Sequence, residues 1–139
     1  PIVIDCAHNP YSAQTLVHSL ARWFPGIRWN LIFGSSTDKD IDGVLQALLP
    51  ISEHVLVTHS YHPRATAPEV LAQKCALLDK TAEIVASPAA ALELAREQLE
   101  PGQGILATGS IFLVADVRTA WGKEANLSLP LGDWEDEPW

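Results

Sequence analysis

The sequence predicts an α/β protein in which helices flank a mainly parallel β-sheet, a three-layer sandwich of Rossmann type. Short apolar runs alternate five times with segments whose apolar residues recur at helical spacing. Strands joined through helices require right-handed crossovers, which place the strands parallel to one another. The 139 residues, 47% of them hydrophobic, are enough for one domain with a sizeable core. Several strand orders fit this pattern.

The first strand is expected at Ile2, Val3 and Ile4. These residues are β-branched and uncharged, which is typical of a strand buried on both faces. A helix is expected to begin at Asn9 and Pro10, because asparagine is a good N-cap and proline is tolerated in the first turn. The apolar face of this helix comprises Ala13, Leu16, Val17, Leu20 and Phe24.

The middle of the chain repeats this alternation. Pro25-Gly26 ends the first helix, and a second strand is expected at residues 29–33. A short amphipathic helix follows, ended by Pro50. Its apolar residues are Ile41, Val44, Leu45 and Leu48. A third strand at residues 54–58 leads into a polar loop through His62-Pro63-Arg64.

A third helix is expected to start at Thr66-Ala67-Pro68-Glu69. Threonine can act as the N-cap, and glutamate three residues later completes a capping box. Proline is tolerated in the first turn of a helix. The residues expected to face inward are Leu71, Cys75 and Leu78.

Two further strand–helix pairs complete the pattern. A fourth strand is expected at residues 83–86, after which Ser87-Pro88 opens a helix that Pro101-Gly102 ends. A fifth strand at residues 105–108 is followed by Gly109-Ser110, which lead into the last helix. The apolar faces of these helices comprise Ala91, Leu92, Ala95 and Leu99 in one and Val114, Val117 and Trp121 in the other.

Composition argues against two classes of partner. The net charge is −8 and the nine basic residues are scattered, so the basic stripe that a nucleic-acid partner requires is missing. No apolar run approaches the ~20 residues that span a bilayer, so no membrane partner is expected. Cys6 and Cys75 lie in apolar patterns and are expected to be buried, reduced thiols, which fits a cytoplasmic location.

The two ends of the chain carry separate predictions. The chain contains no methionine and begins one residue before a core strand, so we expect a part of a longer polypeptide. Residues 1–125 are expected to form the domain and residues 126–139 an acidic tail. Trp134 and Trp139 in this tail either belong to a loosely held terminus or dock on this domain or a neighbour.

Polar segments follow four of the expected strands, at residues 5–9, 34–40, 58–64 and 108–110. Parallel strands all end at the same edge of a sheet, so these segments are expected to converge. In open α/β sheets this edge is where ligands bind. The sequence therefore places its candidate site residues there.

Residues after the first strand are candidates for binding a nucleotide. Asp5 is well placed to accept two hydroxyl hydrogen bonds, as ribose-binding acids do; alternatively, it holds the turn or caps the helix. His8 can donate or accept near a phosphate or a nucleoside, the alternative being a surface histidine. For Asn9 and Pro10, structural roles at the helix start are favoured over chemical ones.

Two further residues are suited to binding a carboxylate. Lys39, flanked by Asp38 and Asp40, offers a single cation in an acidic loop, the alternative being a solvated charge run. Ser110 follows Gly109 at the start of the last helix, where backbone N–H groups and a hydroxyl suit a carboxylate. Simple N-capping is the alternative for Ser110.

Other kinds of site are disfavoured. His59 and His62 lack the helical support and nearby cysteines of a zinc site, so no metal site is expected. Neither Gly-x-Gly-x-x-Gly after the first strand nor Gly-x-x-x-x-Gly-Lys-Ser/Thr occurs, which argues against a dinucleotide fold and a phosphate loop. Val57-Thr58-His59 lacks the aspartate that a response-regulator receiver needs.

Four ordered motifs carry a family resemblance. They are Asp5-Cys6-Ala7-His8-Asn9-Pro10, Phe33-Gly34 leading to Asp38-Lys39-Asp40-Ile41, Pro63-Arg64-Ala65 before the helix at Glu69, and Ile105-Leu106-Ala107-Thr108-Gly109-Ser110-Ile111-Phe112. From Ile2 to about Trp121, the chain resembles the C-terminal domain of the folylpolyglutamate synthase/dihydrofolate synthase family, ATP-dependent amino-acid ligases of the Mur ligase superfamily. Cys6 stands where such enzymes often have glycine, which affects only the local loop geometry.

This resemblance implies a parent enzyme of folate biosynthesis and one-carbon metabolism. With ATP and Mg²⁺ it would phosphorylate a folate carboxylate, and the amine of L-glutamate would then attack the acyl phosphate. The resemblance implies that an N-terminal ATPase domain of the same parent chain holds the phosphate loop and the metal ligands. The 139 residues alone are then expected to be inactive.

The same resemblance implies roles for individual residues. Asp5 would bind the ribose of ATP, with Asn9 in the same nucleotide site. His8 would approach the nucleotide or the reacting groups and is the catalytic candidate. Lys39 and Ser110 would hold the glutamate carboxylate.

Two rival functions stay open. The parent could be a Mur-type ligase acting on a nucleotide-linked sugar peptide, although the His-Asn-Pro form and the Asp-Lys-Asp-Ile loop favour the folate branch. Alternatively, the chain is a non-catalytic module that binds a nucleotide or an amino acid. A missing phosphate loop is what such a module would show.

Overall fold

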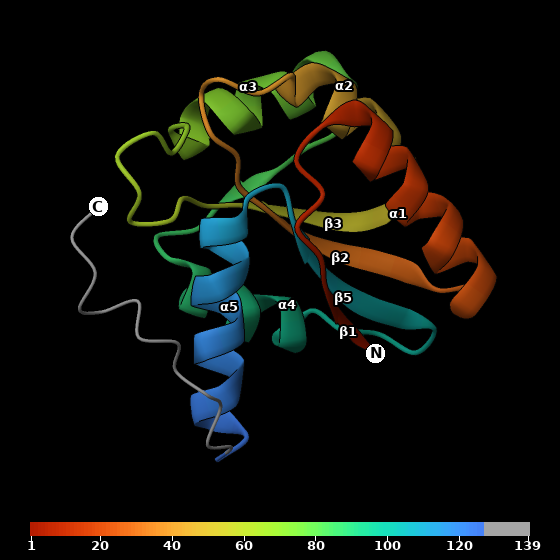
Figure 1. Cartoon of the computed structure of the whole chain (residues 1–139). Helices are drawn as coiled ribbons and strands as arrows, with labels where there is room; N and C mark the ends of the chain where they lie inside the picture. The colour runs from red at the N-terminus through yellow and green to blue at the C-terminus, as the bar shows by residue number, and fades with distance from the viewer. Residues whose placement is uncertain (127–139) are drawn as a thin grey trace.

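The computed structural model of the protein describes residues 1–126. Within these residues, five strands form one parallel sheet in the order β1-β5-β2-β3-β4 (Figure 1). The strands are β1 (Ile2–Ile4), β2 (Arg28–Phe33), β3 (Ser52–Val57), β4 (Glu83–Ile84) and β5 (Gln103–Thr108). The helices are α1 (Pro10–Trp23), α2 (Ile41–Leu48), α3 (Pro68–Leu77), α4 (Pro88–Glu97) and α5 (Ile111–Glu124), with a short 3₁₀ helix at Leu49–Ile51. Both interpretations of the tryptophan-containing tail concern residues 127–139, outside the described part.

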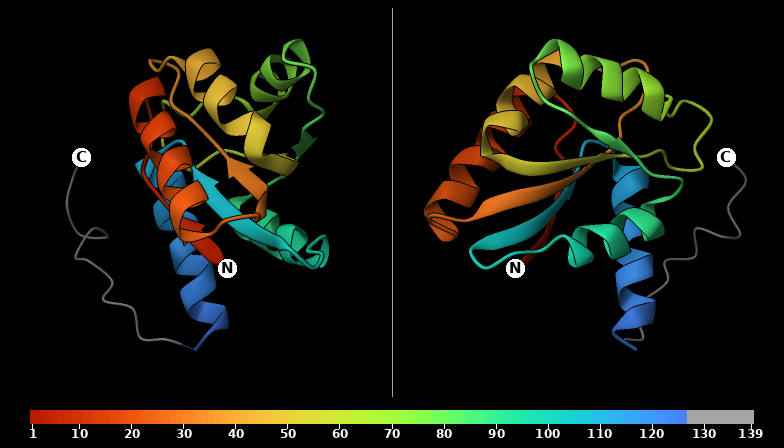
Figure 2. Two further views of the ribbon diagram at one scale, coloured as in Figure 1. Left: turned by 90° about the vertical axis from the view of Figure 1, so that its right-hand side faces the viewer. Right: turned by 180° about the vertical axis from the view of Figure 1, so that it is seen from behind.

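Helices cover both faces of the sheet, which confirms the predicted three-layer α/β sandwich (Figure 2). α1, α2 and α3 pack on one face, and α4 and α5 pack on the other. Alternate residues of β2 enter opposite cores, with Leu31 and Phe33 on the first face and Ile32 on the second. None of the described helices combines the length and hydropathy needed to cross a membrane.

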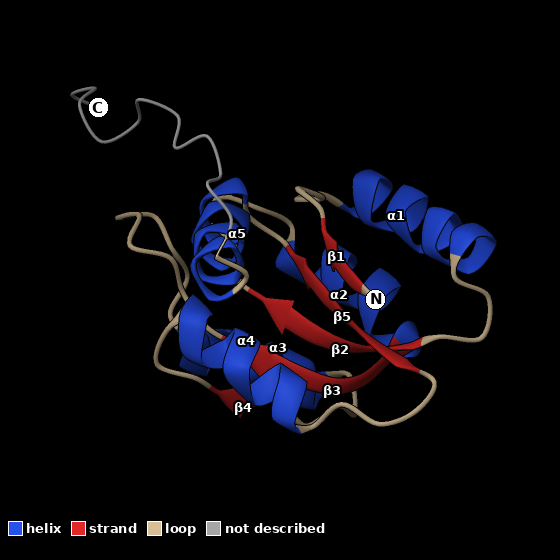
Figure 3. Ribbon diagram, turned by 90° about the horizontal axis from the view of Figure 1, so that it is seen from below, coloured by secondary structure: helices blue, strands red, loops and turns tan. Residues whose placement is uncertain are grey.

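β1 lies at one edge of the sheet and pairs with β5 alone, as Figure 3 shows. The prediction that Ile2, Val3 and Ile4 are buried on both faces is therefore wrong. The side chain of Ile2 is 37% exposed, and Val3 and Ile4 are half-buried. A β-branched run indicates a strand but does not reveal how many neighbours it has. The strand paired on both sides here is β5, which lies between β1 and β2, and the centre of the sheet is β2.

The start of α3 also differs from the prediction. The N-cap is Ala67, and no side chain caps the helix, so the capping box at Thr66 and Glu69 is not formed. Thr66 instead donates its backbone N–H to the carbonyl of Ser35 over 2.8 Å. Its side chain is buried, with a hydroxyl that makes no hydrogen bond. Pairing with the segment after β2 has displaced Thr66 from the capping position.

Three smaller expectations need correction. Cys6 is exposed, because it lies in the loop after an edge strand, whereas Cys75 is buried as predicted. Leu99 is 40% exposed because α4 ends at Glu97, before reaching it. β4 is only two residues long, although Val85 beyond it still donates its N–H to Val57. At the starts of α1 and α4 the chemistry matches the prediction, since Asn9 caps α1 and Ser87 caps α4.

Candidate functional site

The structure brings the polar segments after β1, β2, β3 and β5 together at the end of the sheet from which α5 starts (Figure 1). The backbone N–H of Asp5 donates to Ala107 over 3.0 Å, and the hydroxyl of Thr108 donates to the carbonyl of Ala7 over 3.3 Å. The segment after β2 is joined to the segment after β3, since Thr37 donates its N–H to the carbonyl of Arg64 over 2.9 Å. All four segments therefore form one continuous edge.

Asp5 lies directly after β1, where its carboxylate holds the turn. Its Oδ1 accepts the backbone N–H of Ala7 over 2.8 Å. This is the structural role that the sequence left open as an alternative. Only one carboxylate oxygen is engaged, so the other stays available to accept a hydroxyl from a ligand.

His8 is exposed, and its ring orientation is defined by one bond. Nδ1 lies 2.9 Å from the carbonyl oxygen of Cys6. A carbonyl can only accept, so Nδ1 carries the proton in the neutral ring and Nε2 is left as an acceptor. In this form, Nε2 is suited to a hydroxyl or N–H of a ligand rather than to a phosphate oxygen.

Asn9 is committed to the start of α1. Its Oδ1 accepts the N–H of Ser12 over 2.8 Å, and the Ser12 hydroxyl accepts the N–H of Asn9 over 3.2 Å. This reciprocal pair is a capping box. The structure thus accounts for Asn9 by its role in the fold, next to the loop that carries Asp5 and His8.

Lys39 shares a carboxylate with a second cation. Its Nζ lies 3.4 Å from Oδ2 of Asp38, and Nη1 of Arg64 lies 3.8 Å from the same oxygen. Desolvation acts to raise the pKa of Asp38, but its backbone amide and the two cations together lower that pKa. Two positive groups therefore face one carboxylate, where the sequence had indicated a single cation.

Ser110 stands at the N-cap position of α5 but does not cap it. The residue is 7% exposed, and its side chain makes no capping hydrogen bond to the helix. Simple N-capping, the alternative drawn from the sequence, is therefore not what the structure contains. The hydroxyl stays available at the start of a helix, where the macrodipole favours an anion.

The two cysteines are not activated nucleophiles. Desolvation and the nearby Asp5 charge raise the pKa of the Cys6 thiol, and burial raises the pKa of Cys75 to about 11. A raised pKa lowers the thiolate fraction at neutral pH. Neither thiol is in a disulfide, and only Cys75 is a buried packing residue.

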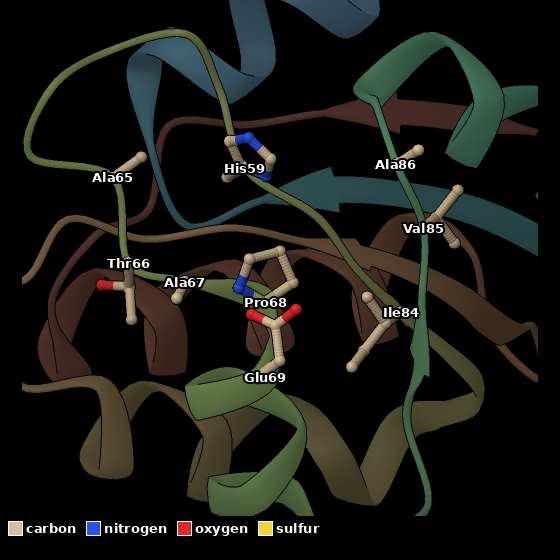
Figure 4. Close-up of a pocket in the computed structure, with 9 residues that line it drawn as sticks. All are labelled: His59, Ala65, Thr66, Ala67, Pro68, Glu69, Ile84, Val85 and Ala86. Carbon is tan, nitrogen blue, oxygen red and sulfur yellow. The ribbon is translucent and has the colours of Figure 1, made fainter.

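A pocket of about 430 Å³ lies beside the site, on the side of β4 (Figure 4). His59 and Glu69 line it from opposite ends, and the side chains between them are mainly apolar. None of the five predicted site residues lines this pocket. No three His, Cys, Asp or Glu side chains between residues 1 and 126 are grouped to hold a metal ion.

Comparison with known proteins places the chain in a family. A family model described as the Mur ligase glutamate ligase domain matches residues 1–111. The chain belongs to this family. The resemblance carried by the four ordered motifs is thereby confirmed.

One curated relative and two sets of solved structures are similar to this chain. The chain is 31% identical to dihydrofolate synthase/folylpolyglutamate synthase of Mycobacterium tuberculosis over 139 residues, covering 88% of this chain and 28% of the relative. Crystal structures of folylpolyglutamate synthase from M. tuberculosis with ADP and AMPPCP match with a TM-score of 0.79 and 31% identity, over 87% of this chain and 29% of theirs.

A third match is the bifunctional folylpolyglutamate synthase/dihydrofolate synthase of Yersinia pestis complexed with AMPPNP and a manganese ion. Its TM-score is 0.75 at 27% identity, over 86% of this chain and 28% of that structure. The domain therefore spans less than a third of the length of each of these proteins.

Sequence reasoning missed several residues at this edge. Arg64 appeared in a polar segment and in a family motif without a role of its own, His62 was considered only as a metal ligand, and Phe112 appeared only in a motif. In the structure the rings of His62 and Phe112 stack with centroids 4.0 Å apart. No local pattern in the sequence predicts this stack, because the two rings are fifty positions apart in the chain.

Proposed function

We propose that this chain is the C-terminal part of a longer ATP-dependent ligase that adds L-glutamate to a folate, acting in the cytoplasm. The single observation that carries the proposal is the arrangement of one sheet edge. Asp5 and His8 lie in the loop after β1, and the cations Lys39 and Arg64 lie in the loops after β2 and β3. The Ser110 hydroxyl, which makes no capping hydrogen bond, lies between β5 and α5. Hydroxyl-binding and carboxylate-binding groups thus share one surface.

The proposed chemistry is amide formation through an acyl phosphate. The γ-phosphoryl group of ATP is transferred to a folate carboxylate, which releases ADP and turns one carboxylate oxygen into part of a leaving group. The glutamate amine then attacks the carbonyl carbon, phosphate departs with the electron pair of the C–O bond, and the amine loses a proton. The same chemistry with dihydropteroate as acceptor forms dihydrofolate.

In this scheme, the residues of this chain bind and orient. The free carboxylate oxygen of Asp5 accepts a ribose hydroxyl, and Nε2 of His8 accepts a hydrogen bond from the nucleotide or the reacting groups. Lys39 and the Ser110 hydroxyl hold a carboxylate of L-glutamate, so that its amine is presented to the acyl phosphate. Asn9 supports the nucleotide loop through its cap.

The metal and the phosphate loop are assigned to the rest of the parent chain. A divalent ion, Mg²⁺ in our proposal, supplies charge neutralisation of the transferring phosphoryl group. The described residues offer no three-ligand set for it, and the sequence contains no phosphate loop. An N-terminal ATPase domain is therefore the partner that we expect to close against this edge.

The assignment of roles is tested by two substitutions in the full-length enzyme. Asp5→Ala is expected to raise KM for ATP about tenfold or more, because it removes a charged acceptor. Lys39→Ala is expected to raise KM for L-glutamate by a similar factor. Steady-state kinetics with each substrate varied in turn measure both effects. Equal effects of both substitutions on both substrates would contradict the assignment.

A substrate comparison separates the two branches of the family. The full-length enzyme is expected to release phosphate with a folate or dihydropteroate and L-glutamate, and to show no turnover with a UDP-linked sugar peptide. Turnover with only the sugar peptide would identify a Mur-type ligase instead.

A further inference from the structure

The segment after β3 is held from two directions. On one side it joins the segment after β2, through the bonds from Thr37 to Arg64 and from Thr66 to Ser35, 2.9 and 2.8 Å long. On the other side it approaches α5, where the Asp116 carboxylate lies near the backbone N–H of Tyr61. This segment therefore bridges the strand-end loop that carries Lys39 and the helix that follows Ser110.

His62 lies at the centre of this bridge, and its ring makes two different contacts. Its ring stacks on Phe112, with centroids 4.0 Å apart and planes 17° from parallel. Its Nδ1 accepts the backbone N–H of Arg64 over 3.2 Å. An acceptor at Nδ1 requires the neutral ring to carry its proton on Nε2.

These contacts connect the two parts of the candidate site for an amino acid. Phe112 lies two residues after Ser110 in the first turn of α5. Arg64 lies two residues after His62, and its guanidinium approaches the Asp38 oxygen that Lys39 also contacts. The path from Ser110 to Lys39 thus runs through Phe112, His62, Arg64 and Asp38.

We propose that His62 is a positioning residue for the amino-acid substrate. The inference rests on the proposed function. Through its stack on Phe112 and its bond from Arg64, His62 sets the separation between Ser110 and Lys39. A small substrate that bridges two anchors binds well only when their separation is held to a fraction of an ångström.

A positioning role predicts a selective kinetic effect. In the proposed scheme His62 contacts no reacting atom, so its loss is expected to weaken ground-state and transition-state binding of the amino acid alike. Such a loss raises KM for L-glutamate and leaves kcat nearly unchanged. The nucleotide loop at Asp5 and His8 makes no contact with His62 that the structure records, so KM for ATP is expected to stay constant. If His62 served only the stability of the fold, its loss would change KM for L-glutamate and KM for ATP together, or would change neither.

The experiment uses the full-length enzyme and a double-mutant cycle. We expect His62→Ala to raise KM for L-glutamate about fivefold to tenfold, in line with the usual strength of a ring pair. Phe112→Ala is expected to give a similar rise, and the double variant a rise no more than twofold above either single variant. Phe112→Leu replaces Phe112→Ala if the latter does not fold, as judged by thermal unfolding.

Two variants separate the contacts of His62. His62→Phe keeps a ring for the stack but loses the acceptor for the Arg64 N–H, so it is expected to raise KM for L-glutamate about threefold, less than His62→Ala does. His62→Asn keeps an acceptor for the Arg64 N–H but loses the stack, so its KM for L-glutamate is also expected to lie between those of wild type and His62→Ala. His18→Ala on the exposed face of α1 is the matched control, with unchanged kinetics.

The outcomes distinguish the two proposals. A wild-type enzyme that ligates no L-glutamate overturns the proposed function, and this inference with it. If the wild-type enzyme is active, the inference about His62 alone is overturned when His62→Ala leaves KM for L-glutamate unchanged. It is also overturned when His62→Ala raises KM for ATP as much as KM for L-glutamate. The same holds if the effects of His62→Ala and Phe112→Ala multiply in the double variant, or if His62→Phe is as impaired as His62→Ala.

Discussion

Gly109 connects β5 to α5 at the centre of the candidate site, and its backbone adopts φ +109°. L-residues rarely adopt this conformation. A Cβ atom at this position would also meet the carbonyl oxygen of Gly34 and the ring of Phe33. The ends of β2 and β5 therefore approach each other closely only because this residue has no side chain.

Gly109→Ala is expected to destabilise the chain by about 3 kcal/mol, which combines the cost of the left-handed backbone with that of overpacking. Gly102→Ala is the matched control, because Gly102 also has a positive φ of 84° but no atom within 4 Å of an added Cβ. Its expected cost is about 1 kcal/mol. Urea denaturation of both variants measures the difference, and equal costs would show that the close approach is unimportant.

Helix α5 has two structural roles, one in the core and one at the candidate site. Its inward face carries Leu113 and Val117 into the core that it shares with α4. Its first turns also hold the segment after β3, through Phe112 and Asp116. Burial raises the pKa of Asp116, while the N–H of Tyr61 acts to lower it. The helix thus links the fold to the site through a partly desolvated carboxyl.

This carboxyl predicts a pH dependence of stability. The unfolded chain loses the Asp116 proton at the ordinary aspartate pKa, whereas the folded chain keeps it to a higher pH. Between these two values the folded state binds more protons, so stability falls as pH rises through the window. Asp116→Asn removes this loss while keeping an acceptor for Tyr61.

We therefore expect the melting temperature of Asp116→Asn relative to wild type to increase as pH rises from about 3.5 to 7. Thermal unfolding across this range measures the difference, with the exposed Glu93→Gln on α4 as control. A constant difference between Asp116→Asn and wild type at every pH would refute the assigned cause.

In the molecule as a whole, the sheet separates two cores, and the candidate site lies at the carboxyl ends of its parallel strands. The helices of both layers supply core residues, while the four strand-end segments provide the polar groups. Binding groups are thus present without a phosphate loop in the sequence. Such an arrangement suits one side of an active site that another domain completes.

The 139 residues alone are therefore expected to form no amide bond and to release no phosphate from ATP with a folate and L-glutamate. A coupled phosphate-release assay measures this, with the full-length enzyme as the positive control. Measurable glutamate ligation by the isolated chain would show that the catalytic groups are all present here.

Much of the fold follows from local patterns in the sequence. Each strand and helix was indicated by nearby residues, as Asn9 and Ser12 show by capping α1 within four positions. The convergence of the four polar segments at the carboxyl ends of the strands also followed, because parallel strands end on the same side of the sheet. Periodicity and capping are short-range effects, and the residues that produce them lie within one or two turns of each other.

The strand order, the exposed position of β1 and the recruitment of Thr66 by Ser35 depend instead on which distant segments pair. The same holds for the stack of His62 on Phe112 and for the second cation, Arg64, beside Lys39. Local composition encodes none of these pairings, since many crossover arrangements satisfy the same alternation. Burial of the two faces of the sheet selects one arrangement, and the contacts that shape the site arise from that choice.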